Sequence, residues 1–151
     1  MIFDRTQNDV DIAILLRNTK VKKFETLTES EIATLEKGTL TINTLNRIET
    51  KQEELKNLFN EMGYWNTPTT NKTWGENDIF NVDEFQRILD NTNVLRNAFF
   101  VYKETPNTPP ISYYWDDINA LEKILYDLDV MISNVKADYI YCGEFECGEL
   151  I

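Results

Sequence analysis

Three segments of the chain share one hydrophobic spacing, and this spacing constrains the fold more than any other feature. In residues 41–62, 82–101 and 114–136, apolar residues recur at alternating steps of three and four. The stripes consist of Leu45, Ile48, Leu55, Phe59 and Met62, then Phe85, Ile88, Leu95 and Phe99, then Ile118, Leu121, Leu125, Leu128, Ile132 and Val135. Such a period indicates an α-helix with a narrow apolar seam. Because three seams bury one another when the helices pack together, the sequence predicts a mainly α protein built on a three-helix bundle.

One polar residue, Gln52, interrupts the first seam. A buried amide at such a position can fix the register of neighbouring helices, as it does in coiled coils. The alternative is a side chain that reaches solvent or a loop carbonyl. The sequence leaves both interpretations open.

Two capping signals precede the first seam. Thr6 is followed three residues later by Asp9, and Thr28 by Glu31, which is the spacing of a capping box. The first signal predicts a short N-terminal helix. The second predicts a short helical turn that stops at Gly38.

The connections between the seams differ in character. Residues 64–81 are too long for a simple turn and contain Trp65 and Trp74, so we expect an ordered loop or short strand that lays both tryptophans on the bundle. For Trp115 we likewise expect a core position. Residues 105–110 contain three prolines and cannot be helical, which predicts a surface loop.

The end of the chain changes its pattern. Tyr139 and Tyr141 alternate with other residues, and a Cys-Gly-Glu unit then occurs twice. This alternation predicts a β-hairpin or an extended tail. We therefore divide the chain into a helical bundle domain, 1–138, and a C-terminal strand or hairpin tail, 139–151. Interaction candidates in this tail are Tyr139, Tyr141, Glu144, Phe145 and Glu149.

Charge restricts the partners. The formal net charge is −11, and from residue 104 onward ten acidic residues face two lysines, which gives −8. Such a field disfavours binding to phosphate backbones. The only basic cluster, Arg17, Lys20, Lys22 and Lys23, is too small for a nucleic-acid groove. No apolar run is long enough to span a bilayer, and the N-terminus does not resemble a signal peptide, so we expect cytoplasmic synthesis and no membrane partner.

The residues that most enzymes use are missing. The chain has no histidine, which removes the usual general base and the commonest zinc ligand. Two cysteines alone cannot close a structural zinc site, and the five glycines form no phosphate-binding loop. We therefore expect a protein that is not an enzyme, with no metal and no cofactor.

Several motifs together resemble a known group of domains. Residues 3–10 (FDRTQNDV) are similar to a D-R-T-x-x-D-V start, residues 28–31 (TESE) to an acidic helix start, and residues 37–38 (KG) and 45–49 (LNRIE) to a K-G and D-L-N-R-V/I-E sequence. Trp74 fits a T-x-W step, and residues 141–149 resemble a closing Y-S-G-E…S-G-E repeat. These are features of tail-associated and minor structural proteins of phages and prophages of Gram-positive bacteria. Departures are Thr44 in place of an acid, and Cys142 and Cys147 in place of serines.

This resemblance implies a structural or accessory protein of the phage tail or baseplate region, which acts by docking or oligomerisation. Its partners would be other phage tail proteins or further copies of itself, and its location would be the virion tail. Among the matching residues, we expect Asn46, Arg47 and Glu49 to form one network that ties a helix start to a neighbouring segment. The acidic charge supports an alternative function, a phage-encoded inhibitor that mimics nucleic acid and binds a host protein.

Overall fold

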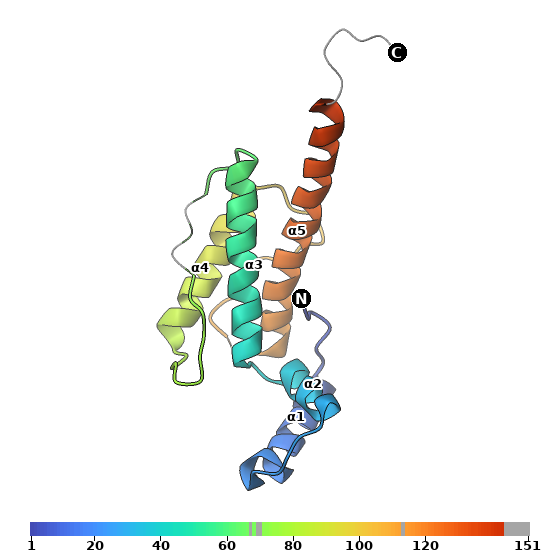
Figure 1. The fold of residues 1–151 in the computed structure, drawn as a ribbon, viewed down its shortest axis with the longest axis vertical. Helices are drawn as coiled ribbons and strands as arrows, with labels where there is room; N and C mark the ends of the chain where they lie inside the picture. Colours follow the sequence, from blue (N-terminus) through green and yellow to red (C-terminus); the bar gives the residue numbers. More distant parts are fainter. Residues whose placement is uncertain (67, 69–70, 113, 144–151) are drawn as a thin grey trace.

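The computed structural model describes residues 1–66, 68, 71–112 and 114–143 (Figure 1). Its elements are α1 (Gln7–Thr19), the 3-10 helix η1 (Val21–Lys23), α2 (Glu29–Gly38), α3 (Ile42–Glu61), α4 (Val82–Ala98) and α5 (Trp115–Gly143). Among the described residues there is no strand. The prediction of a mainly α protein is confirmed.

The predicted strand at the start of the C-terminal tail is wrong for residues 139–143, because α5 runs through Gly143. Helical spacing explains the difference. After Ile132 and Val135, the next seam positions at steps of four and three are Tyr139 and Cys142. The last stretch of α5 therefore continues the period of 3.6 residues, which prevails over the short alternation of tyrosines. The remainder of the predicted tail, 144–151, lies outside the described residues.

Helices α3, α4 and α5 lie side by side, and each contacts the other two (Figure 1). Their apolar faces form the core: Leu45, Ile48, Leu55 and Phe59 from α3, Phe85, Ile88, Leu89 and Leu95 from α4, and Ile118, Leu121, Ile124, Leu125, Leu128 and Ile132 from α5. Met62 and Phe99 pack partly buried against this core. The faces of α4 and α5 are wider than a single seam, since Leu89 and Ile124 are also buried.

Gln52 lies fully buried between α3 and α4. Its Nε2 donates to the Ile88 carbonyl and to Thr92 Oγ1, both at 2.8 Å. A shift of α4 by one turn would break both bonds, so this amide fixes the register of the two helices. Its partners lie on a helix, and neither solvent nor a loop carbonyl is among them.

The loop between α3 and α4 places its two tryptophans differently. Trp74 is buried and packs edge-on against Phe80, with ring centroids 5.4 Å apart, as predicted. Trp65 is 81% exposed, so the prediction that it lies on the bundle is wrong. The preceding residue, Tyr64, packs on Phe99 instead (centroids 4.6 Å apart), and successive side chains of a non-helical segment point in opposite directions. Trp115, expected in the core, is half-buried.

Helices α1 and α2 pack on each other at one end of the molecule (Figure 1). Both begin with the predicted capping boxes, at Thr6 and Thr28, although α2 is a helix of 10 residues rather than a short turn. The two helices approach most closely at Gly38, where a Cβ atom would collide with the Asp9 carbonyl and the Ala13 methyl group. We call residues 6–39 the N-terminal hairpin.

Gly38→Ala should loosen the N-terminal hairpin. Alanine is favoured over glycine in a helix by about 1 kcal/mol, but overpacking against fixed backbone costs about 1–3 kcal/mol, so we expect net destabilisation. Urea unfolding, combined with hydrogen exchange of the α1 and α2 amides, measures it. Gly75→Ala is the matched control, because its nearest neighbour, Asp78 Oδ2, lies at an ordinary 3.6 Å. Stabilisation by Gly38→Ala would contradict the close approach.

Candidate functional site

A buried carboxylate, Glu49, holds the loop before α4 against α3. Glu49 is 1% exposed and accepts hydrogen bonds from Trp74 Nε1 (2.7 Å), the Lys72 backbone N–H (2.6 Å) and Arg87 Nη1 and Nη2 (2.8 and 2.5 Å). One turn earlier, the Asn46 amide accepts from the Trp74 N–H (2.7 Å) and donates to the Trp74 carbonyl (3.0 Å). These bonds fix the loop to one face of α3. They also explain why Trp74 is buried, since its indole N–H finds an acceptor there.

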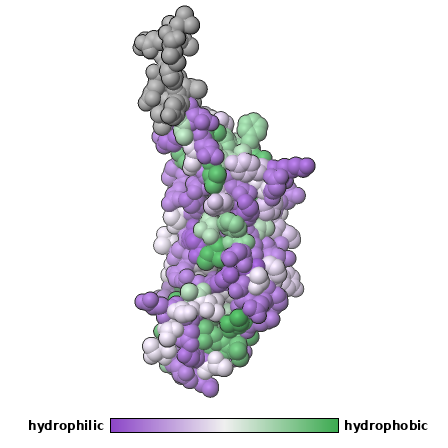
Figure 2. All heavy atoms as spheres, turned by 90° about the vertical axis from the view of Figure 1, so that its right-hand side faces the viewer, coloured by the Kyte–Doolittle hydropathy of each residue, from purple (hydrophilic) through white to green (hydrophobic). Residues whose placement is uncertain are grey.

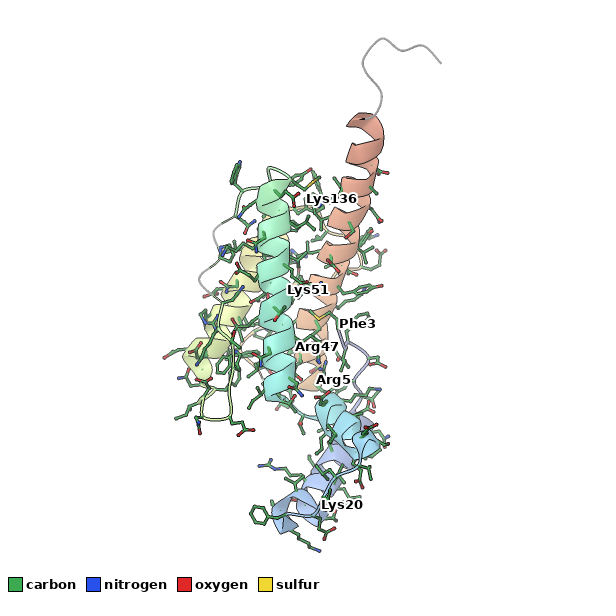
Figure 3. The ribbon with its side chains drawn as sticks, in the orientation of Figure 1. Phe3, Arg5, Lys20, Arg47, Lys51 and Lys136 are labelled. Carbon is green, nitrogen blue, oxygen red and sulfur yellow. The ribbon has the colours of Figure 1, made fainter. Side chains whose placement is uncertain are left out.

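A second buried carboxylate, Glu122 on α5, holds the N-terminus of the chain. Its side chain is fully buried and accepts from Arg5 Nη1 (2.7 Å), Arg47 Nε (2.8 Å) and the Ile2 N–H (3.0 Å). Asn119, one turn earlier on α5, accepts from the Arg5 N–H (3.2 Å) and donates to the Arg5 carbonyl (2.9 Å). Figure 3 places Arg5 and Arg47 close together at the end of the bundle that faces the N-terminal hairpin. We call this group the Glu122 clamp.

The three residues expected to form one network therefore lie in two clusters. Asn46 and Glu49 hold the Trp74 loop, whereas Arg47 belongs to the Glu122 clamp. The reason is helical geometry, because Arg47 projects from α3 about 100° away from Asn46 and so faces α5. No pattern in the sequence indicated the central role of Glu122, because acidic residues of a helix usually lie on its solvated face.

Neither cluster offers reactive chemistry of its own. Each carboxylate is surrounded by donors from this chain, including at least one guanidinium, so its lone pairs are occupied. The pKa of Arg87 is raised, chiefly by its hydrogen bonds to Glu49. Both clusters are positioned to hold segments together.

The N-terminal hairpin presents a surface of a different kind. From Ile12 to Phe24, its exposed large apolar side chains are Ile12, Ile14, Leu15, Val21 and Phe24, and its exposed cations are Arg17, Lys22 and Lys23. We call these residues the Ile12–Phe24 surface. Hydrophobic side chains gather at this end of the molecule, over α1 and α2 (Figure 2). The most exposed of these apolar side chains are Leu15 at 63% and Phe24 at 97%.

The charge of this surface is opposite to that of the whole chain. No acidic residue occurs from Ile12 to Phe24, while the chain as a whole carries −11. Lys20 pairs with Glu31 across the hairpin at 2.6 Å. Arg17, Lys22 and Lys23 form no ion pair with any residue that the structure describes. Three cations are thus left beside exposed apolar side chains.

Phe24 has an unusual backbone conformation for so exposed a residue. Its φ of 56° and ψ of 31° lie in the left-handed region, where it closes η1. Asparagine or glycine adopts this conformation at lower cost than an aromatic residue. Local stability therefore does not explain the phenylalanine at this position.

A groove continues this surface toward the bundle. It has a volume of about 340 Å³ and is lined by Val10 and Ile14 of α1, by Leu40, and by Trp115 and Ile118 of α5, with Arg5 at its side. Ile14 belongs both to the groove and to the Ile12–Phe24 surface. Arg5 Nη2 is buried and makes no hydrogen bond with any of the described residues. The groove thus combines an apolar lining with one guanidinium N–H that has no acceptor.

Two of the interaction candidates in the tail lie far from this surface. Tyr139 and Tyr141 belong to the last turns of α5, at the end of the molecule opposite the N-terminal hairpin (Figure 1). Glu144, Phe145 and Glu149 lie outside the described residues. Sequence reasoning missed the Ile12–Phe24 surface, although the combination of Leu15 with Lys22, Lys23 and Phe24 outside any seam was a usable signal.

Within the described ranges, no three Cys, Asp or Glu side chains cluster as metal ligands would. In the same part of the chain, no helix has the length and apolarity needed to cross a bilayer. The chain matches no protein-family model, and comparisons with curated proteins and with solved structures give no significant match.

Glu122→Gln should destabilise the protein strongly. The substitution leaves two guanidinium groups beside a neutral amide in a buried site, and breaking a buried ion pair costs about 3–5 kcal/mol. The measurement is the free energy of unfolding in urea. Glu54→Gln is the control, because Glu54 pairs with Lys51 at the surface with its side chain 57% exposed, where a pair contributes at most about 1 kcal/mol. Equal effects of the two substitutions would rule out the clamp.

The N-terminal hairpin should lose stability in acid. Hydrogen bonds from the Thr6 side chain and backbone lower the pKa of Asp9 from 3.8, and a hydrogen bond from Lys20 lowers the pKa of Glu31 from 4.5. A lowered carboxyl pKa contributes stability that is complete above the ordinary value and is lost as the pH falls through the folded value.

Helicity of α1 and α2, followed by NMR, should therefore decrease as the pH falls below these ordinary values. The double variant Asp9→Asn with Glu31→Gln keeps hydrogen-bonding groups of the same size but cannot titrate. Its hairpin should show no such transition. A variant that unfolds over the same pH range as the natural protein would contradict the assignment to these two carboxyls.

Proposed function

We propose that this chain is a non-catalytic structural or accessory protein of the tail or baseplate region of a bacteriophage, and that it works by docking to another protein. The observation that carries the docking role is the Ile12–Phe24 surface. Exposed apolar side chains next to exposed cations, on a protein that is otherwise strongly acidic, are typical of an interaction site. A solvated face would not expose Phe24 and Leu15 together.

The rest of the molecule serves as the scaffold for this surface. In our proposal α3, α4 and α5 form a three-helix bundle, with Gln52 fixing its register. The Glu122 clamp grips Ile2 and Arg5, which directly precede α1. The clamp thereby determines where the N-terminal hairpin leaves the bundle. A rigid platform of this kind lowers the entropy cost of docking.

The assignment to a phage tail has a separate basis, the resemblance of residues 3–10, 37–49 and 141–149 to tail-associated proteins. Absence of histidine and the saturation of Glu49 and Glu122 by donors support a role without catalysis. The protein would be made in the cytoplasm of the bacterial host and end in the virion.

The alternative, an acidic inhibitor that mimics nucleic acid, is supported by the charge of −8 from residue 104 onward. Two of those ten acids are poorly placed for it. Glu122 is buried against two arginines, and Asp127 is 3% exposed and bonded to Thr105 Oγ1 at 2.7 Å and to Lys123. A mimic needs its carboxylates on the surface, so docking through the hairpin is the better-supported function.

The proposal predicts that the double variant Leu15→Glu with Phe24→Asn will be lost from phage particles. Glutamate is a good helix former, and asparagine tolerates the left-handed backbone, so the variant should fold. Mass spectrometry of purified particles should find the natural chain at a fixed ratio to other tail proteins and the variant strongly depleted. Ile79→Glu, at a site 80% exposed on a loop, is the control and should be retained.

Absence of the natural chain from particles, together with abundant expression in infected cells, would contradict the tail assignment and favour the inhibitor. Presence of the natural chain and the double variant in equal amounts would contradict docking through the Ile12–Phe24 surface.

A further inference from the structure

We propose that the Ile12–Phe24 surface binds the C-terminal segment, residues 139–151, of a second copy of this chain, so that copies associate head to tail. The inference deepens the proposed function and rests on it, because it names the occupant of the same docking surface. Three observations carry it: complementary composition, the positions of the two ends of the molecule, and the groove beside α1.

The C-terminal segment has the composition that this surface would select. It contains the acids Glu144, Glu146 and Glu149 and no lysine or arginine. Its apolar and aromatic residues are Tyr139, Ile140, Tyr141, Phe145, Leu150 and Ile151. The Ile12–Phe24 surface has the reverse charge, with Arg17, Lys22 and Lys23 unpaired among the described residues. Opposite charges beside apolar area on both partners favour association and fix its orientation.

The segment cannot reach the hairpin of its own chain. α5 has 29 residues, and a helix of that length spans roughly 43 Å at 1.5 Å per residue. Its first residue, Trp115, lines the groove with α1, whereas its last, Gly143, lies at the opposite end of the molecule (Figure 1). Residues 144–151, fully extended, cover at most about 29 Å. The occupant must therefore come from another copy.

The groove gives the contact a defined anchor. Val10, Ile14, Leu40, Trp115 and Ile118 supply an apolar wall, and Arg5 supplies a buried Nη2 without an acceptor. The sequence Glu144-Phe145-Glu146 places an aromatic side chain between two carboxylates. In the proposed contact Phe145 enters the groove, and a neighbouring carboxylate accepts from Arg5 or from the exposed cations. An aromatic anchor in a pocket beside charge pairs is a common form of interface hot spot.

Head-to-tail contact has a consequence for assembly. Each contact uses the hairpin of one copy and the segment of another. Such an interface builds either a closed ring, of which a reciprocal dimer is the smallest, or an open filament.

Blocking one side at a time provides the test. The head variant is Leu15→Glu with Phe24→Asn, and the tail variant lacks residues 144–151. Sedimentation velocity over about a hundredfold concentration range should show the natural chain forming dimers or larger species, and each variant alone as a monomer. The two variants mixed should form a 1:1 complex and nothing larger, because one supplies an intact tail and the other an intact hairpin. Circular dichroism checks that both variants keep their helices.

Charge exchange is a second, independent measurement on full-length chains. Lys22→Glu with Lys23→Glu should weaken association at least tenfold, and adding Glu144→Lys with Glu146→Lys to the same chain should restore it. Association of the natural chain should also weaken as salt rises from about 50 to about 500 mM. Ile79→Glu is again the control and should assemble like the natural chain.

A natural chain that stays monomeric, variants that assemble alone, or mixed variants that give no 1:1 complex would each overturn the inference. The particle experiment above separates its failure from that of the proposed function. If the natural chain is monomeric but the head variant is lost from particles, the hairpin binds a different tail protein and only the inference fails. If the chain is monomeric and the head variant is retained in particles, both fail.

Discussion

The buried carboxylate of Glu122 is the interaction on which the arrangement of this protein depends. It joins three parts of the chain that are distant in sequence: α5, Arg47 on α3, and the first residues through Arg5 and Ile2. Desolvating a carboxylate is costly, and its attraction to two guanidinium groups offsets this cost only in the correct geometry. The clamp therefore contributes more to specificity than to net stability, because alternative placements of the N-terminus would leave a buried charge unpaired.

Glu49 plays the same part for the loop between α3 and α4. It binds the Trp74 indole, a Lys72 backbone N–H and the Arg87 guanidinium, so the 20-residue connection between the two helices is fixed to α3 at Lys72 and Trp74. With Gln52 between α3 and α4, three buried polar groups determine how the apolar seams align. Apolar burial supplies most of the driving force for the fold, but it is non-directional and would tolerate shifts that these groups forbid.

The stable core and the proposed interaction surface lie in different parts of the molecule. Helices α3, α4 and α5 form the apolar core, whereas the N-terminal hairpin buries only Ala13 and Gly38 and leaves Leu15 and Phe24 in solvent. A pair of short helices with so small a core depends on its capping boxes and on the close contact at Gly38. The proposed docking role gives the exposed apolar residues a partner, and in our proposal residues 139–151 of a second copy have the matching composition.

Local patterns in the sequence were sufficient to locate the helices. Heptad spacing located α3, α4 and most of α5, and Thr6 and Thr28 marked the starts of α1 and α2, because periodicity and capping are local properties. The sequence wrongly indicated a strand or extended tail for the last tyrosines, which lie in α5, since both periods fit a short stretch. Tertiary contacts alone show which acids are buried and that Arg47 and Glu49 belong to separate clusters. They also show that Trp74 is buried, that Trp65 is exposed, and that residues 12–24 form an exposed surface. These outcomes depend on contacts between residues up to 120 positions apart, which no local pattern encodes.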